Sequence, residues 1–161
     1  MTMKSNPAIV WLRQDFRILR NEALSFATNN HANVSAIYIF KKKKFDNKRE
    51  AQKWWIYESL KNFKFDLEKY NVNLEIASYN TYQDFFEKYS KKKLSFYWNK
   101  IYEPDYINFD RKISKFLKNK NVSYKIFKGN ILNEYQEVTK KDNTPFKVFT
   151  HFWNTAEPIY I

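Results

Sequence analysis

The stretch AIVWLRQDFRILRNEAL, residues 8–24, begins as an apolar run and ends in a cluster of charged side chains. Residues 8–12 are uninterrupted apolar residues, which is typical of a strand buried on both faces of a sheet. The charged residues that follow are Arg13, Asp15, Arg17 and Arg20. In an open parallel sheet, ligands bind beyond the carboxyl ends of the strands. We therefore expect the end of this strand to face a ligand or a second layer of protein.

Further short runs of β-branched and aromatic residues predict four more buried strands, at 34–40, 73–77, 94–98 and 122–127. Helical patterns separate these runs. Strands that alternate with helices pair in parallel through right-handed crossovers. The sequence therefore predicts an α/β protein with a doubly wound, Rossmann-like parallel sheet. About five strands are expected, with helices on both faces and an irregular connector after the last strand.

Apolar spacing indicates which faces of the helices point inward. The longest helix is expected at 49–70, with one apolar face formed by Trp54, Tyr57, Leu60, Phe63, Leu67 and Tyr70. Thr81 is a candidate N-cap for a second helix at 81–90, which directs Phe85 and Phe86 inward. A third helix follows Pro104 and is expected to bury Ile113, Phe116 and Leu117.

Composition indicates a folded, basic chain. The 161 residues suit one domain, and the 43% hydrophobic and 20% aromatic content exceeds that of disordered chains. The net charge of +12 could favour nucleic acid, because clustered Lys and Arg bind phosphates. Lys greatly outnumbers Arg, however, and an AT-rich genome would also produce this pattern. The Lys runs at 41–44 and 91–93 are then solvated loop edges.

Several kinds of site are excluded by residue counts. With no Cys and only two His, His31 and His151, the chain has no thiol nucleophile, disulfide or histidine-built zinc site, and no metal is expected. Gly129 is the only glycine, so neither a dinucleotide fingerprint nor a P-loop is present. No signal peptide or membrane-spanning stretch is recognisable, and we expect a cytoplasmic protein.

Aromatic residues near the predicted strand ends suit a flat ligand. Six of them could stack on a heterocycle: Trp11, Tyr38, Phe40, Trp54, Trp55 and Trp98. Aromatics at these spacings are also typical of an ordinary core. The residues alone leave both interpretations open.

Four motifs, in order, resemble the N-terminal domain of the photolyase and cryptochrome flavoproteins. The first combines Trp11, Arg13, Asp15, Phe16, Arg17, Asn21, Ala23 and Leu24. The others are ESLKNF at 58–63, FYWNKIYEP at 96–104 and TPFKVFTHFWN at 144–154. Their order and spacing make the resemblance specific, and it covers essentially the whole chain.

The resemblance implies an N-terminal α/β antenna domain at 1–128 and the start of an interdomain linker at 129–161. The C-terminal helical domain, which holds FAD and contacts DNA in this family, would be absent. The implied function is the chromophore-binding part of a deoxyribodipyrimidine photolyase, which repairs pyrimidine dimers with light. No catalytic residue is assigned, and the fragment alone is expected to be an inactive monomer. A cryptochrome-like photoreceptor domain and a stand-alone nucleotide-binding module remain the alternatives.

The resemblance also implies an antenna-chromophore pocket. Its residues would be Arg13, Tyr38, Phe40, Lys41, Gln52, Trp55, Trp98, Asn99 and Glu103. Ile101 and Lys41 stand where the deazaflavin-binding branch usually has acidic residues, and Asp105–Tyr106 replaces the Asn-Glu pair of the folate-binding branch. Folate, deazaflavin, flavin and an empty pocket all remain open.

A structural role is also implied for a second set of residues in the first loop and the linker: Asp15, Arg17, Asn21, Phe146, Phe149, Phe152 and Trp153. In that interpretation, Arg13, Asp15 and Arg17 pair with one another and with the linker rather than with a ligand. Glu103 and Pro104 could similarly do no more than begin a helix.

Overall fold

A computed structural model describes residues 6–41, 45–46 and 49–160. Within this part of the chain, contacts divide the protein into two compact units, Met1–Gly129 and Asn130–Ile161. We describe each unit by itself. No helix among the described residues is both long and apolar enough to cross a membrane.

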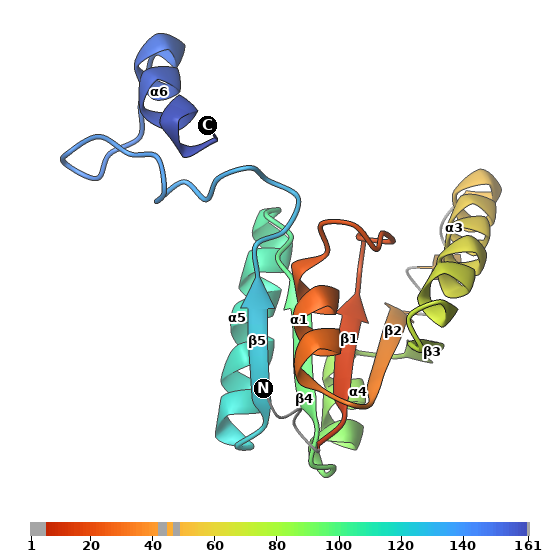
Figure 1. The fold of residues 1–161 in the computed structure, drawn as a ribbon. Helices are drawn as coiled ribbons and strands as arrows, with labels where there is room; N and C mark the ends of the chain where they lie inside the picture. The colour runs from red at the N-terminus through yellow and green to blue at the C-terminus, as the bar shows by residue number, and fades with distance from the viewer. Residues whose placement is uncertain (1–5, 42–44, 47–48, 161) are drawn as a thin grey trace. The chain divides into compact units, whose positions relative to one another are not determined.

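The first unit is built on a five-stranded parallel sheet (Figure 1). Its strands are β1 (Ala8–Leu12), β2 (Val34–Lys41), β3 (Asn73–Tyr79), β4 (Ser95–Asn99) and β5 (Ser123–Phe127). They lie in the order β3-β2-β1-β4-β5, and every neighbouring pair is parallel. The predicted fold class is confirmed. The strand order reverses between β1 and β4, which is where an open sheet of this kind leaves a crevice.

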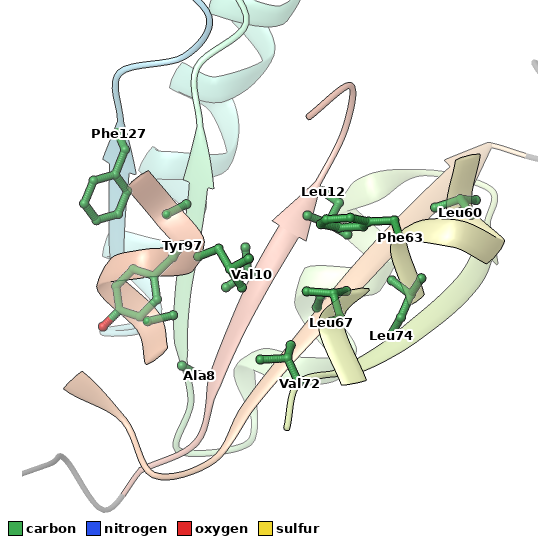
Figure 2. Packing of buried hydrophobic residues seen from close by; sticks show 14 residues of the cluster. Ala8, Val10, Leu12, Leu60, Phe63, Leu67, Val72, Leu74, Tyr97 and Phe127 are labelled. Atoms are coloured by element: carbon green, nitrogen blue, oxygen red, sulfur yellow. The ribbon is translucent and has the colours of Figure 1, made fainter. Parts of the chain in front are cut away.

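Helices cover both faces of the sheet. Helices α1 (Glu22–Asn30) and α3 (Glu50–Glu68) pack on one face, and α4 (Tyr82–Ser90) and α5 (Pro104–Asn119) pack on the other. Alternate residues of β1 point to opposite faces, so Val10 joins the core under α1 and α3, and Trp11 joins the core under α4 and α5. Figure 2 shows Val10, Leu12, Phe63 and Leu67 in the first of these cores.

The predicted inner face of α3 is only half right. Its central residues, Leu60, Phe63 and Leu67, are buried as expected. Trp54, Tyr57 and Tyr70 are more than half exposed, which corrects the prediction at both ends of the helix. The reason is the direction of the side chains: Ile56 packs against the core one turn before Leu60, so the buried line of α3 runs through Ile56, Leu60, Phe63 and Leu67. Trp54 and Tyr57 point away from that line, and Tyr70 follows the end of the helix.

The other helices agree more closely with the sequence. Thr81 caps α4 by accepting a hydrogen bond from the backbone N–H of Asp84, and Phe85 and Phe86 are fully buried. In α5, Ile113 and Leu117 are buried and Phe116 is partly buried. Helix α1 was not predicted, although Asn21 gives it an N-cap.

The second unit contains a helix where an irregular connector was expected. Helix α6 runs from Phe149 to Ala156 and is followed by a single 3-10 turn, η1 (Glu157–Ile159). Its exposed aromatic side chains contact one another, with the ring centroids of Phe149 and Trp153 6.1 Å apart. The aromatic spacing of TPFKVFTHFWN is therefore compatible with a short amphipathic helix.

Candidate functional site

An open cavity of about 820 Å³ lies beyond the carboxyl ends of β1 and β2. Its volume is in the range of pockets that hold small molecules and cofactors. Residues from both sides of the sheet line it: Arg13, Gln14, Phe16, Tyr38, Ile39, Phe40, Lys41, Phe45, Ala51, Gln52, Trp55, Ile56, Tyr82, Glu103 and Tyr106. The first turns of α3 form one wall, and the amino-terminal residues of α4 and α5 form another.

Most of the residues predicted for a chromophore pocket meet in this cavity. Seven of the nine line it: Arg13, Tyr38, Phe40, Lys41, Gln52, Trp55 and Glu103. They come from segments that are far apart in the sequence and that the parallel topology brings to one edge. Trp98 and Asn99 are not among the lining residues.

Arg13 is the most buried charged group of the cavity, with 9% of its surface exposed. Its guanidinium donates to Asp110 Oδ1 at 2.7 Å and Oδ2 at 3.3 Å, and also to the backbone carbonyl of Asn99. It lies 5.0 Å from the ring centroid of Trp11. Burial raises the pKa of the Asp110 carboxyl, while the Arg13 charge opposes that increase. Arg13 thus fills the crevice between β1 and β4 and ties the end of β1 to α5.

Trp98 and Asn99 belong to the interior instead. Trp98 is fully buried in the core under α4 and α5, where its ring lies 5.8 Å from Trp11. Asn99 is buried at the end of β4, and its amide donates to Asp15 Oδ2 at 2.6 Å and to Asn21 Oδ1 at 2.8 Å. Its side-chain oxygen accepts from the backbone N–H of Ala23 at 3.0 Å. Asn99 therefore holds the first loop and α1 against β4.

Three tyrosines give the cavity much of its wall: Tyr38 on β2, Tyr82 on α4 and Tyr106 on α5. Burial raises the pKa of Tyr82 to about 12, with smaller contributions from Tyr106 and Tyr38. Burial also raises the pKa of Tyr38. The hydroxyl groups of Tyr38 and Tyr82 therefore stay protonated at neutral pH and can donate hydrogen bonds to a ligand. Lys41 lies 5.1 Å from the ring centroid of Tyr82 and adds a positive charge nearby.

The arrangement suits a flat, polar heterocycle. Aromatic walls provide stacking surface, and Lys41, Gln52, Glu103 and the tyrosine hydroxyls provide hydrogen bonds at the edges of a ring. Among the described residues there is no group of three or more His, Cys, Asp or Glu side chains that could hold a metal ion.

Sequence reasoning missed Tyr82 and Tyr106 as lining residues. Both had a usable signal, because Tyr82 directly follows the predicted N-cap Thr81 and Tyr106 follows Glu103 and Pro104. In a parallel sheet, the helix after a strand begins near the carboxyl edge of the sheet. Residues in the first turn of that helix can therefore reach a cavity at this edge. Six other lining residues were also missed: Gln14, Phe16, Ile39, Phe45, Ala51 and Ile56.

The residues predicted for the first loop contact one another as well as Asn99. Asp15 Oδ1 accepts from the backbone N–H of Arg13 at 3.0 Å, and Arg17 donates to the carbonyl of Arg20. Asn21 caps α1 and donates to the carbonyl of Arg17 at 3.0 Å. The aromatic residues Phe146, Phe149, Phe152 and Trp153 lie in the second unit, where they contact one another.

Comparisons with known proteins agree with one another on the family. The family model described as DNA photolyase matches residues 8–160. A deoxyribodipyrimidine photo-lyase of Agrobacterium fabrum is 30% identical over 158 residues, which cover 98% of this chain and 33% of that protein. Cryptochrome-2 of Arabidopsis thaliana is 28% identical over 152 residues, which cover 90% of this chain and 24% of that protein.

Solved structures show the same fold. A class III photolyase from Agrobacterium tumefaciens superposes with a TM-score of 0.79 at 28% identity, covering 98% of this chain and 33% of that one. An archaeal photolyase from Sulfolobus tokodaii, solved with two FAD molecules, gives a TM-score of 0.71 at 23% identity, covering 92% and 34%. The chain thus spans about a third or less of the length of these relatives.

Proposed function

Because this chain belongs to the DNA photolyase family, we propose that it is the light-harvesting part of a light-driven flavoenzyme that repairs pyrimidine dimers in DNA. In this proposal, residues 1–128 form the antenna domain and residues 129–161 begin the linker to the rest of the protein. FAD and DNA would be bound by the rest of the protein, since this chain spans about a third of the length of its relatives. The alternative is a cryptochrome-like photoreceptor, since Cryptochrome-2 is nearly as similar in sequence.

The observation that carries the antenna proposal is the strand-end cavity and its aromatic walls. A cavity of about 820 Å³ accommodates the ring system of a folate, flavin or deazaflavin. When bound, such a chromophore absorbs light and passes the excitation energy to the flavin. The protein's part is to stack on the ring through Trp55 and tyrosines such as Tyr82, and to hold polar ring atoms through Gln52 and Glu103. Trp98 supports this cavity from the core, and Asn99 supports it by holding the first loop against β4.

The second aromatic cluster has a proposed role in joining the domains. Phe149 is 72% exposed and Trp153 is 39% exposed on α6. Exposed aromatic side chains that stack along one helix suit burial against another protein surface. We assign Phe146, Phe149, Phe152 and Trp153 to contact with the remainder of the protein.

A binding titration with the 161-residue chain tests the antenna proposal. Reduced folate, FMN and a deazaflavin are added separately, and chromophore absorbance and tryptophan fluorescence are followed. One of the three should give a saturable change with one site per chain. Trp55→Ala should weaken that binding by about tenfold, because one stacking surface is lost.

Trp54→Ala is the matched control. Trp54 and Trp55 are adjacent on α3 and are 65% and 62% exposed, but only Trp55 lines the cavity. Equal loss in both variants, or no saturable change with any of the three chromophores, would contradict the proposal. Repair of pyrimidine dimers under blue light by the whole protein separates the photolyase from the photoreceptor. The 161-residue chain alone is expected to show no repair.

A further inference from the structure

The charged side chains of the strand-end cavity do not neutralise one another. Among the residues that the structure describes, three charged ones line the cavity: Arg13, Lys41 and Glu103. Arg13 is already paired, because its guanidinium donates to the two carboxylate oxygens of Asp110 at 2.7 Å and 3.3 Å. Of these three, Lys41 and Glu103 are therefore the residues whose charge a ligand meets.

Lys41 is a partly buried cation without a counterion in the described part of the chain. It is the last residue of β2 and forms no ion pair with any described carboxylate. Its ammonium lies 5.1 Å from the ring centroid of Tyr82, at a distance where a cation is attracted to the face of an aromatic ring. The ring holds the ammonium at the cavity wall but does not neutralise its charge.

The groups around Lys41 add no negative charge to the cavity wall. Burial raises the pKa of Tyr82 to about 12 and also raises the pKa of Tyr38, so both hydroxyl groups are neutral at neutral pH. Tyr82 is the first residue of α4, and the amino end of a helix carries a partial positive charge. The acidic residue of that first turn, Asp84, accepts a hydrogen bond from the backbone N–H of Thr81 at 2.9 Å and does not line the cavity.

Glu103 differs from Lys41 in its surroundings. It is the N-cap residue of α5, directly before Pro104. The partial positive charge at the start of α5 therefore compensates part of the Glu103 charge. Lys41 ends a strand and has no such compensation. A ligand with a negatively charged group at Lys41 thus gains the most from the charges of this cavity.

We propose that the cavity binds its chromophore through an anionic substituent, a phosphate or a carboxylate, to which the Lys41 ammonium donates a charge-assisted hydrogen bond. Such hydrogen bonds are stronger than those between neutral groups. The cavity volume of about 820 Å³ lies toward the upper end of the range for small-molecule pockets, which leaves room for a substituent beside a ring system. This inference rests on the antenna proposal, because it concerns the ligand of the same cavity.

Lys41 is in this way a residue that determines specificity. Two chromophores with the same ring system make the same stacking contacts with the aromatic walls, so a group beyond the ring has to distinguish them. An anionic group replaces the water around the Lys41 ammonium with a counter-charge. A neutral group displaces that water without replacing the lost interaction, which costs binding free energy.

Matched pairs of ligands test the role of the charge. FMN and riboflavin share one ring system, but only FMN has a phosphate. Tetrahydrofolate and tetrahydropterin share another, but only tetrahydrofolate has carboxylates. In the pair that binds to the 161-residue chain, the anionic member should bind at least about tenfold more tightly at low salt. The preference should shrink at high salt, because ions screen a partly exposed charge.

The variant Lys41→Met separates the charge from the rest of the ligand. It should lower the affinity for the anionic ligand by about tenfold and leave the affinity for its neutral partner nearly unchanged. Lys61→Met is the matched control, because it removes the same charge from an exposed residue of α3 that does not line the cavity. The control should keep the full preference for the anionic ligand. Far-ultraviolet circular dichroism checks that both variants remain folded.

The outcomes distinguish a failure of this inference from a failure of the antenna proposal. Equal affinity of the wild-type chain for the charged and the neutral ligand overturns the inference alone. Equal loss of both ligands in Lys41→Met does the same, as does binding of a neutral deazaflavin without binding of any anionic chromophore. If no chromophore gives saturable binding, both the inference and the antenna proposal are overturned.

Discussion

At the scale of single residues, the location of Arg13 could be predicted from the sequence, but its hydrogen-bond partners could not. Its position after β1 indicated a place at the functional edge, and it does line the cavity. Its main partner, Asp110, is 97 residues away and had no sequence signal. Pairing among Arg13, Asp15 and Arg17 was only partly right, because the Arg13 guanidinium bonds to Asp110 and Asn99. Only the sheet topology brings α5 beside the end of β1.

The buried pair gives a prediction for stability. Asp110→Asn leaves the Arg13 charge buried without its counterion, which should lower the free energy of unfolding by about 3–5 kcal/mol. The double variant Arg13→Met, Asp110→Leu removes both charges and should lose much less. Urea unfolding followed by circular dichroism measures each value.

An exposed pair of equal length is the control for that series. Glu50 and Lys53 are also 2.8 Å apart, but Glu50 is on the surface. Glu50→Gln should change the free energy of unfolding by less than about 0.5 kcal/mol. If Asp110→Asn is equally mild, the buried pair does not stabilise the fold.

At the scale of elements, strands were predicted better than helix faces. Each predicted strand lies within two residues of an observed one. Burial on both faces explains this for β1 and β4, which are buried throughout. The prediction of burial on both faces is wrong for β3 and β5, which lie at the edges of the sheet and are mostly exposed or partly exposed. Trp54, Tyr57 and Tyr70 were placed inward by spacing alone. Spacings of three and four residues fit more than one line along α3, and the line that is buried runs through Ile56 instead of Trp54 and Tyr57. Trp98 and Asn99 were assigned to the pocket for a related reason: β4 ends at the right edge but points these side chains into the interior.

The hydrogen bonds by which Asn99 connects β4 to the first loop and α1 give a prediction at this scale. Asn99→Ala removes three hydrogen bonds, to Asp15, Asn21 and the backbone of Ala23. It leaves buried polar groups unpaired, so we expect a loss of about 2–4 kcal/mol in the free energy of unfolding. Asn108→Ala, at an exposed position of α5, should have little effect. Chemical denaturation gives the stabilities.

Ligand binding distinguishes this role from direct contact with a chromophore. If Asn99 acts by holding the first loop, folded Asn99→Ala protein should bind the chromophore with nearly wild-type affinity. An unchanged stability together with a large loss of affinity would instead place Asn99 in the binding site.

At the scale of the whole molecule, the location of the cavity was predictable but the identity of its ligand was not. Parallel strands bring their carboxyl ends to one edge whatever the loops contain, so Tyr38, Phe40 and Lys41 could be placed there from sequence. If the antenna proposal holds, the choice among folate, flavin and deazaflavin depends on a few hydrogen bonds. Those come from loop and helix-start residues such as Glu103 and Tyr106, whose positions depend on packing rather than on local pattern.

The division of the chain into two units leads to a last prediction. Every residue that lines the cavity lies at or before Tyr106, and the α/β unit ends at Gly129. The five strands and both layers of helices are also complete by then. A chain shortened to residues 1–129 should therefore unfold cooperatively and bind the chromophore as tightly as the 161-residue chain. A chain that ends at Asn99 lacks α5 and β5, which cover Trp98 and part of the core, and it should not fold. Thermal unfolding and the same chromophore titration measure both variants. A marked loss of affinity in the 1–129 chain would show that residues 130–161 contribute to binding, and the proposed antenna domain would then have to extend into the second unit.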